Sequence, residues 1–239
     1  MEKGHFYETM KTGRYKFIDA VKGIGAILVI IGHLGINYYL TIWIYMFHMP
    51  LFFFISGFLE KESSSCLRTD IFHKANKILY PYFSLGICFN VCFSSVFDWI
   101  CGNKRFEILK KLIALLYGNY INENNYNGTL WFLAALFSTY LLFRTINFLA
   151  KKEPFKILYT CMIIICGLIV KNIIGTYNFR LPYCMDIALF AIGFYMGGYF
   201  YKSYKEKLNI NRIHKVIFLL ILGTCIGGGK LFIYVPCRL

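Results

Sequence analysis

The sequence contains few charged residues for its length. Only 16% of its 239 residues are Asp, Glu, Lys or Arg, whereas 58% are hydrophobic and 19% are aromatic. A soluble domain carries about a quarter charged residues and presents polar faces to water. So little charge beside so much apolar surface excludes an ordinary soluble globular domain and favours an integral membrane protein.

The nine cysteines lack the spacing of a metal site or of a disulfide framework. The chain has no Cys-x-x-Cys pair and no zinc-ligand spacing. The odd count excludes complete pairing, and most cysteines lie inside apolar runs, where they act as small hydrophobic side chains. The sequence therefore predicts no metal centre.

Long apolar runs recur along the chain. A helix of about 20 mostly apolar residues crosses a hydrocarbon core of about 30 Å. The runs that approach or meet this length are Phe17–Leu40, Trp43–Leu59, Ile78–Cys101, Leu130–Leu149, Ile157–Ile174, Tyr183–Tyr201 and Val216–Val235. They predict an all-α, polytopic transmembrane helix bundle of about seven spans. A polar lead over residues 1–16 precedes the first run and no cleavage site follows it, so we expect this run to remain as an anchor.

The basic residues are distributed unevenly between the apolar runs. Lys and Arg gather before the first run and after the second, fourth and sixth. The positive-inside rule therefore predicts a multi-pass protein of the plasma (inner) membrane with a cytoplasmic N-terminus. This placement accounts for the net charge of +14 and argues against nucleic acid as a partner. In the outer segment 102–129, apolar residues at helical spacing predict an amphipathic helix lying at the membrane interface.

Three ionisable residues lie in or at the edge of the first run: Asp19, Lys22 and His33. Charged groups in a membrane helix are costly and usually face the protein interior or a wet cavity. Lys22 and His33 lie about 20° apart around a helix and about 16 Å apart along it, with Asp19 on the same side. Two structural alternatives stay open: Lys22 snorkels to the interface, and His33 is a hydrogen-bonded packing residue.

A second histidine, His48, is part of the motif Phe-His-Met-Pro at residues 47–50 in the next run. A short outer turn would bring His48 to a depth comparable to that of His33, and Pro50 is expected near the helix start, where its missing N–H matters least. Two histidines at one level suggest proton handling. A metal site would need a third ligand, which the sequence does not place nearby.

Four segments, in order, resemble acyltransferase family 3 of membrane O-acyltransferases, especially its sugar O-acetylase branch. The first has the family's Asp, basic residue and His as Asp19, Lys22 and His33. The others are the runs 47–58, 130–137 and 181–188, so the resemblance extends from about Arg14 to Lys202.

The resemblance implies transfer of an acyl group, usually acetyl from acetyl-CoA, to a hydroxyl of a cell-envelope sugar or polysaccharide. It implies no tightly bound cofactor, and its partners are acyl-CoA, a glycan acceptor and membrane lipid. It carries over His33 and His48 as catalytic residues, with Lys22, Arg14, Asp19 and Trp131 binding substrate. A neutral His33 suits the general base, and Lys22 with Arg14 suits the phosphates of CoA. An acyl-histidine intermediate and direct transfer both stay open.

Two other functions compete with acyl transfer. A transporter or flippase of envelope glycans would use the same buried charges as a substrate path, although the pattern of Asp19, Lys22 and His33 has no second copy in the chain. The second competing hypothesis is an inactive, truncated remnant, because the family has about ten spans and the domain predicted over 17–239 has about seven. The shorter bundle predicts low activity for the 239 residues alone.

Overall fold

The structure is a computed structural model, and it describes residues 16–34, 37–61, 66–100, 108–118, 130–177 and 181–207. Every regular element within these ranges is a helix, which confirms the predicted all-α class. The chain forms two compact units. Of the described residues, the first unit contains those up to Leu59 and those from Gly197 to Lys207, and the second contains those between Glu60 and Met196.

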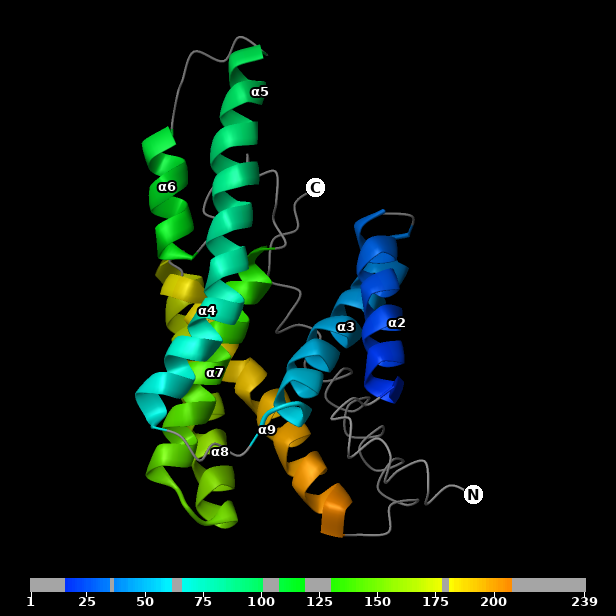
Figure 1. The fold of residues 1–239 in the computed structure, drawn as a ribbon, viewed down its shortest axis with the longest axis vertical. Helices are drawn as coiled ribbons and strands as arrows, with labels where there is room; N and C mark the ends of the chain where they lie inside the picture. Colours follow the sequence, from blue (N-terminus) through cyan, green and yellow to red (C-terminus); the bar gives the residue numbers. More distant parts are fainter. Residues whose placement is uncertain are drawn as a thin grey trace. The chain divides into compact units, whose positions relative to one another are not determined.

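The first unit is built from α2 (Lys16–His33), α3 (Tyr38–Phe58) and the last part of α9 (Met185–Lys207) (Figure 1). Helix α2 packs on α3 through a stripe spaced by seven residues, Ile18, Gly25 and Gly32, all of which are buried. A Cβ on Gly25 would lie 2.9 Å from the ring of Phe52, so a larger residue here would require that ring to shift. Apolar positions repeated every seven residues keep one helix face against its neighbour.

The turn between these two helices lies earlier than the sequence predicted. Helix α2 ends at His33 and α3 begins at Tyr38, because the Asn37 side chain caps the new helix. Its Oδ1 accepts hydrogen bonds from the backbone N–H of Tyr39 (2.9 Å) and of Leu40 (3.2 Å). The expectation that Pro50 lies near a helix start was therefore wrong, since Pro50 is buried in the middle of α3.

The end of α9 closes the first unit against α3. A Cβ on Gly198 would overlap the backbone O of Phe54 and lie 2.8 Å from the N of Phe58, so α9 touches the backbone of α3 directly. The Tyr201 ring lies 5.9 Å from the rings of both phenylalanines and packs with Ile18. Small residues permit such close helix contacts in membranes, where dispersion replaces the hydrophobic driving force.

The second unit begins with a long helical rod made of α4 (Leu67–Leu85), the π-helical η1 (Gly86–Phe93) and α5 (Ser94–Ile100). Its 34 residues correspond to about 51 Å, well beyond a hydrocarbon core of about 30 Å. The rod starts eleven residues before the predicted apolar run.

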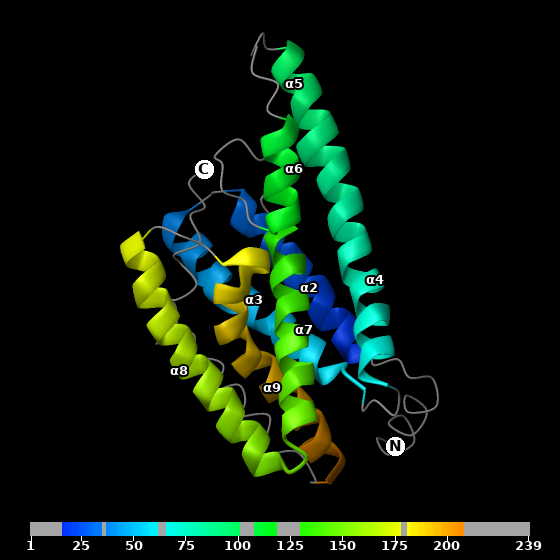
Figure 2. The ribbon, with the colours of Figure 1, turned by 90° about the vertical axis from the view of Figure 1, so that its left-hand side faces the viewer.

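The predicted amphipathic helix is α6 (Ile108–Tyr117), but it lies along the rod and is antiparallel to it (Figures 1 and 2). The Lys111 ammonium lies 2.7 Å from the Asp98 carboxylate, and the Tyr82 hydroxyl donates to the Leu115 carbonyl over 2.8 Å. These contacts hold α6 against the rod.

Helices α7 (Trp131–Leu149) and α8 (Glu153–Tyr177), the 3₁₀ turn η3 (Pro182–Cys184) and the start of α9 complete the second unit. Five helices in the described part of the chain are long and apolar enough to cross a membrane. They are Tyr38–Phe58, Leu67–Ile100, Trp131–Leu149, Glu153–Ile173 and Pro182–Tyr204. Helix α2 carries three charges at its start, and the run 216–235 lies outside the described residues, so the number seven stays a prediction.

A strained turn leads into α9. Tyr183 and Cys184 both adopt left-handed backbone angles, with φ of 51° and 49°. The Ser138 hydroxyl donates to the Tyr183 carbonyl over 2.8 Å, and Gly118, itself at φ 74°, leaves no room for a Cβ beside the Tyr183 backbone. Such conformations cost about 1–3 kcal/mol each and persist only where surrounding contacts fix them.

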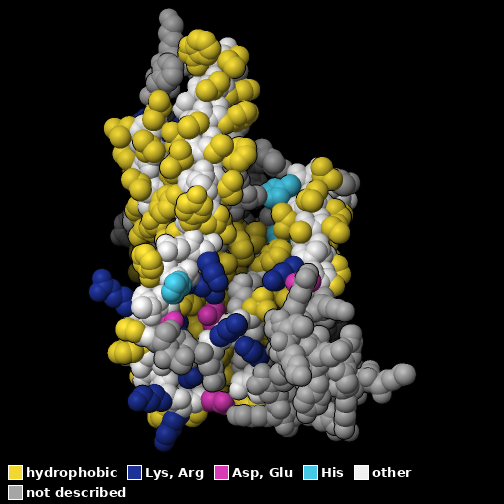
Figure 3. Space-filling model, in the orientation of Figure 1, with side chains coloured by type: hydrophobic (Ala, Val, Ile, Leu, Met, Phe, Trp, Pro, Cys, Tyr) yellow, Lys and Arg dark blue, Asp and Glu magenta, His cyan; other side chains and the backbone are white. Residues whose placement is uncertain are grey.

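Charged side chains of the second unit gather at the end where α4 begins and α7 meets α8 (Figure 3). Hydrophobic side chains cover α5 and α6 at the other end. The basic residues after the second and fourth apolar runs therefore lie on one side of this unit, as the predicted topology requires.

Candidate functional site

The first unit holds four of the six predicted site residues. Asp19, Lys22 and His33 lie on α2 and are exposed, whereas His48 lies on α3 and is 0% exposed. The two histidines lie on α2 and α3, which pack against each other in this unit.

His48 is fixed by its own helix. Its Nδ1 lies 2.6 Å from the carbonyl oxygen of Ile44, one turn earlier. A carbonyl oxygen only accepts hydrogen bonds, so Nδ1 carries the proton of this bond. The ring of Phe52, one turn later, meets the imidazole edge-on at 6.3 Å. The orientation of the His48 ring is therefore set by contacts on both sides along α3.

Lys22 and His33 are exposed on one flank of the buried stripe of Ile18, Gly25 and Gly32, about 60° and 80° around the helix from its centre. Gly23 lies on the far side of α2 from this stripe, and a Cβ there would meet no atom within 4 Å. This arrangement agrees with the expected common side of the ammonium and the imidazole. It leaves His33 accessible while His48 is enclosed.

The remaining two predicted site residues are Arg14 and Trp131. Arg14 lies outside the described residues. Trp131 begins α7 in the second unit, where it is half-buried with its ring 6.3 Å from that of Phe132. Within the described ranges, no group of three or more His, Cys, Asp and Glu residues is arranged to hold a metal ion.

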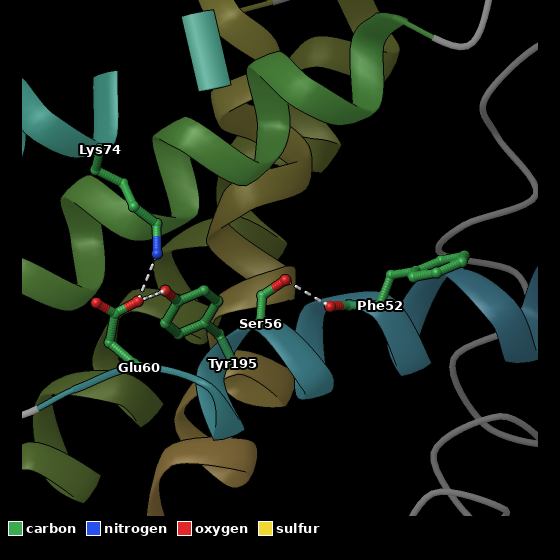
Figure 4. A network of polar contacts seen from close by, with 5 residues as sticks. All are labelled: Phe52, Ser56, Glu60, Lys74 and Tyr195. Atoms are coloured by element: carbon green, nitrogen blue, oxygen red, sulfur yellow. Dashed lines mark hydrogen bonds and ion pairs between the residues drawn. The ribbon is translucent and has the colours of Figure 1, made fainter. Parts of the chain in front are cut away.

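A polar network in the second unit was missed by the sequence reasoning (Figure 4). The Glu60 carboxylate accepts a hydrogen bond from the buried Tyr195 hydroxyl (2.6 Å) and lies 2.7 Å from the Lys74 ammonium. That ammonium also lies 4.8 Å above the centre of the Tyr140 ring. A cation over an aromatic face is attracted by the negative face of the ring.

One turn from Lys74 and Tyr140, a second ion pair joins the same helices. The Arg144 guanidinium lies 2.5 Å from the Asp70 carboxylate, and both side chains are largely buried. From the sequence, Lys74 and Arg144 were expected only to belong to the basic residues that follow the second and fourth apolar runs. The sequence pattern that could have indicated this network is the i, i+4 spacing of Asp70 and Lys74, which puts both residues on one face of a helix.

We expect Arg144→Ala to destabilise the second unit by about 3 kcal/mol, because Asp70 would lose its guanidinium partner in a buried position. Thermal unfolding of the purified protein in detergent measures the change. The matched control is Lys152→Ala at an exposed position, which should have little effect. If Asp70→Leu with Arg144→Leu is no more stable than Arg144→Ala, the ion pair is not the source of the loss.

Comparison with known proteins identifies the family. The family model for the acyltransferase domain matches residues 15–236, which is nearly the whole chain. The chain therefore belongs to this acyltransferase family, and the resemblance seen in the sequence is confirmed. It is a member of this family whose described part contains five helices long and apolar enough to cross a membrane.

One curated relative is the nodulation protein NolL of Sinorhizobium fredii (strain NBRC 101917 / NGR234). It is 28% identical over 222 residues, which cover 84% of this chain and 52% of NolL. The chain thus spans about half the length of this relative. No solved structure matches the chain.

Proposed function

We propose that this protein transfers an acetyl group from cytoplasmic acetyl-CoA to a hydroxyl of a cell-envelope sugar or polysaccharide. The family supports acyl transfer, and the observation that carries the finer assignment is that the exposed His33 and the enclosed His48 lie on two helices that pack against each other. Acyl transfer to a hydroxyl needs a base at the moment of attack, and an imidazole meets that need at neutral pH.

His33 acts as the general base in this proposal. In direct transfer it takes the proton of the acceptor hydroxyl while the oxygen forms a bond to the acyl carbon. The carbon–sulfur bond of the thioester breaks, and the CoA thiolate leaves and receives a proton. Transfer through an acyl-imidazole would use the same residue in two steps. Both routes give one ester and one CoA thiol per turnover.

Lys22 binds the donor. Its ammonium is exposed on the side of α2 that carries His33, about 16 Å nearer the start of the helix. A compact cation suits the phosphate groups of CoA, and Arg14 adds positive charge in the sequence before α2. The donor would approach from the α2 start and the acceptor from the His33 end.

If cytoplasmic acetyl-CoA approaches from the start of α2, the N-terminus is cytoplasmic. Cysteines introduced in the second unit test this orientation. In a background without native cysteines, we expect Lys110→Cys to react with an impermeant maleimide on intact cells and Lys152→Cys to react only after permeabilisation. Both side chains are exposed, on α6 and before α8 respectively. Ile165→Cys, exposed in the middle of an apolar helix, is the unreactive control. The reverse pattern would overturn the orientation.

The proposed function is tested with membranes that contain the 239-residue chain, acetyl-labelled acetyl-CoA and a panel of envelope glycans. We expect a low but measurable amount of label on a glycan, released by mild base because the product is an ester. Label that stays in acetyl-CoA with every acceptor, in membranes where the chain is present and folded, would contradict the proposal.

A further inference from the structure

The start of α4, which precedes the apolar run beginning at Ile78, carries polar side chains on both of its sides. On the inner side, the Asp70 carboxylate pairs with Arg144, and the Lys74 ammonium pairs with Glu60. These two ion pairs account for the charges that face the second unit. The polar side chains on the other side of α4 take no part in this packing, so they need a separate explanation.

The other side of this segment forms a continuous exposed surface, which we call the α4 outer face. On a helix with 100° per residue, this surface occupies about half of the circumference and excludes Asp70 and Lys74. Arg68 marks one edge and Lys77 the other, and the rings of Phe72 and Tyr80 between them are 64% and 76% exposed. The surface comprises the exposed residues Arg68, Phe72, His73, Asn76, Lys77 and Tyr80.

The composition of the α4 outer face matches the headgroup level of a membrane. Aromatic rings with a polar edge, such as Tyr80, are enriched at that level. Arg68 and Lys77 can lay their methylene groups along apolar surface while their charges stay among polar groups. The face extends to the first residues of the apolar run, where headgroups meet acyl chains. Its exposed side chains therefore contact lipid headgroups.

The charge balance identifies the kind of headgroup. In the described part of the second unit, the inner carboxylates of Glu60 and Asp70 are paired, and no ion pair includes Arg68 or Lys77. Other cations of this unit gather at the same end (Figure 3). A zwitterionic headgroup would bring its own ammonium to this surface, whereas an anionic headgroup brings only negative charge. Each Lys or Arg near an anionic leaflet strengthens binding by about fivefold.

We propose that the α4 outer face binds anionic phospholipids through their headgroups. His73 and Lys77 lie one turn apart in one row and contact the phosphate of one lipid, while Arg68 attracts a neighbouring headgroup at the other edge. Phe72 and Tyr80 pack against the glycerol and the first part of the acyl chains. The inference is independent of acetyl transfer, because none of these residues belongs to the proposed site.

Photo-crosslinking of the full chain in bilayers tests this surface locally. The photoreactive amino acid p-benzoylphenylalanine is introduced at Asn76 and, separately, at Ile165, which is 57% exposed in the middle of α8 and meets acyl chains. Labelled phosphatidylglycerol and phosphatidylcholine with identical acyl chains are supplied in equal amounts. We expect the ratio of the two crosslinked lipids at position 76 to favour phosphatidylglycerol by about tenfold or more over the ratio at position 165.

Three variants separate the effect of charge from that of structure. Arg68→Gln with Lys77→Gln should bring the ratio at position 76 down to that at position 165. Arg68→Lys with Lys77→Arg, which keeps both charges, should preserve the preference. Lys110→Gln is the matched control, because it removes one exposed cation at the opposite end of the second unit and should change nothing.

Three results would overturn the inference. The first is an equal ratio at positions 76 and 165 in the wild-type background. The second is a preference that survives Arg68→Gln with Lys77→Gln, since the cations would then not recognise the lipid. The third is loss of the phosphatidylglycerol crosslink when excess inorganic phosphate is added at constant ionic strength, which would identify a site for free phosphate instead of a lipid.

Discussion

Replacing His33 with alanine should lower acetyl transfer by about a hundredfold to ten-thousandfold, which is the usual contribution of a general base. The effect should fall on kcat, because the imidazole acts when the acceptor oxygen attacks. His33 is exposed on α2 and lies outside the buried stripe of that helix, so the fold should tolerate alanine. Initial rates with labelled acetyl-CoA and a saturating glycan acceptor measure the loss.

Lys22→Ala is the matched control on the same side of the same helix. It should raise KM for acetyl-CoA while leaving kcat near the wild-type value, because it removes a contact to donor phosphates. If His33→Ala keeps near-normal turnover, the base is another residue. A Lys22→Ala protein with normal KM and low kcat would give Lys22 a role in the chemical step instead.

Replacing Gly198 with alanine should destabilise the first unit by at least about 3 kcal/mol, at the upper end of overpacking effects. The added Cβ would overlap the backbone O of Phe54 and crowd the N of Phe58. Backbone atoms at the C-terminal end of α3 cannot rotate away as a side chain could. A lower unfolding temperature in detergent, with less protein recovered as a single species, is the expected result.

Gly197→Ala provides a closely matched control. Its Cβ would have Phe54 Cδ2 as nearest neighbour at 3.8 Å, an ordinary contact, and alanine favours a helix over glycine by up to about 1 kcal/mol. This variant should match or exceed the stability of the wild type. Equal behaviour of the two alanine variants would mean that α9 does not touch the backbone of α3.

Most helices could be predicted because a membrane-spanning helix requires a long run of apolar residues, which is visible in the sequence. The ends were harder to predict. The start of α4 at Leu67 precedes its apolar run, since the polar residues there pair with other helices, as Asp70 does with Arg144. The turn before α3 depends on one side-chain cap at Asn37, which a hydropathy pattern does not register.

The candidate site was predictable in part for a physical reason. Ionisable groups in membrane helices are rare, so His33, Lys22 and His48 stand out, and helical geometry relates the first two. The burial of His48 depends on tertiary packing, and its bond to Ile44 depends on the side-chain orientation within α3, so neither can be read from hydropathy. The contacts of Glu60 with Lys74 and Tyr195 join residues far apart in sequence, which no local pattern reveals.

The central claim is that this chain esterifies a glycan, and sealed proteoliposomes test it most directly. The purified protein is reconstituted, acetyl-CoA is supplied at the face of the α2 start, and the glycan panel is placed on the other side. The account predicts acetyl ester on a glycan and an equal amount of free CoA thiol, both absent with His33→Ala. A glycan that crosses the membrane unmodified, with no thiol released, would contradict acyl transfer and identify a transporter.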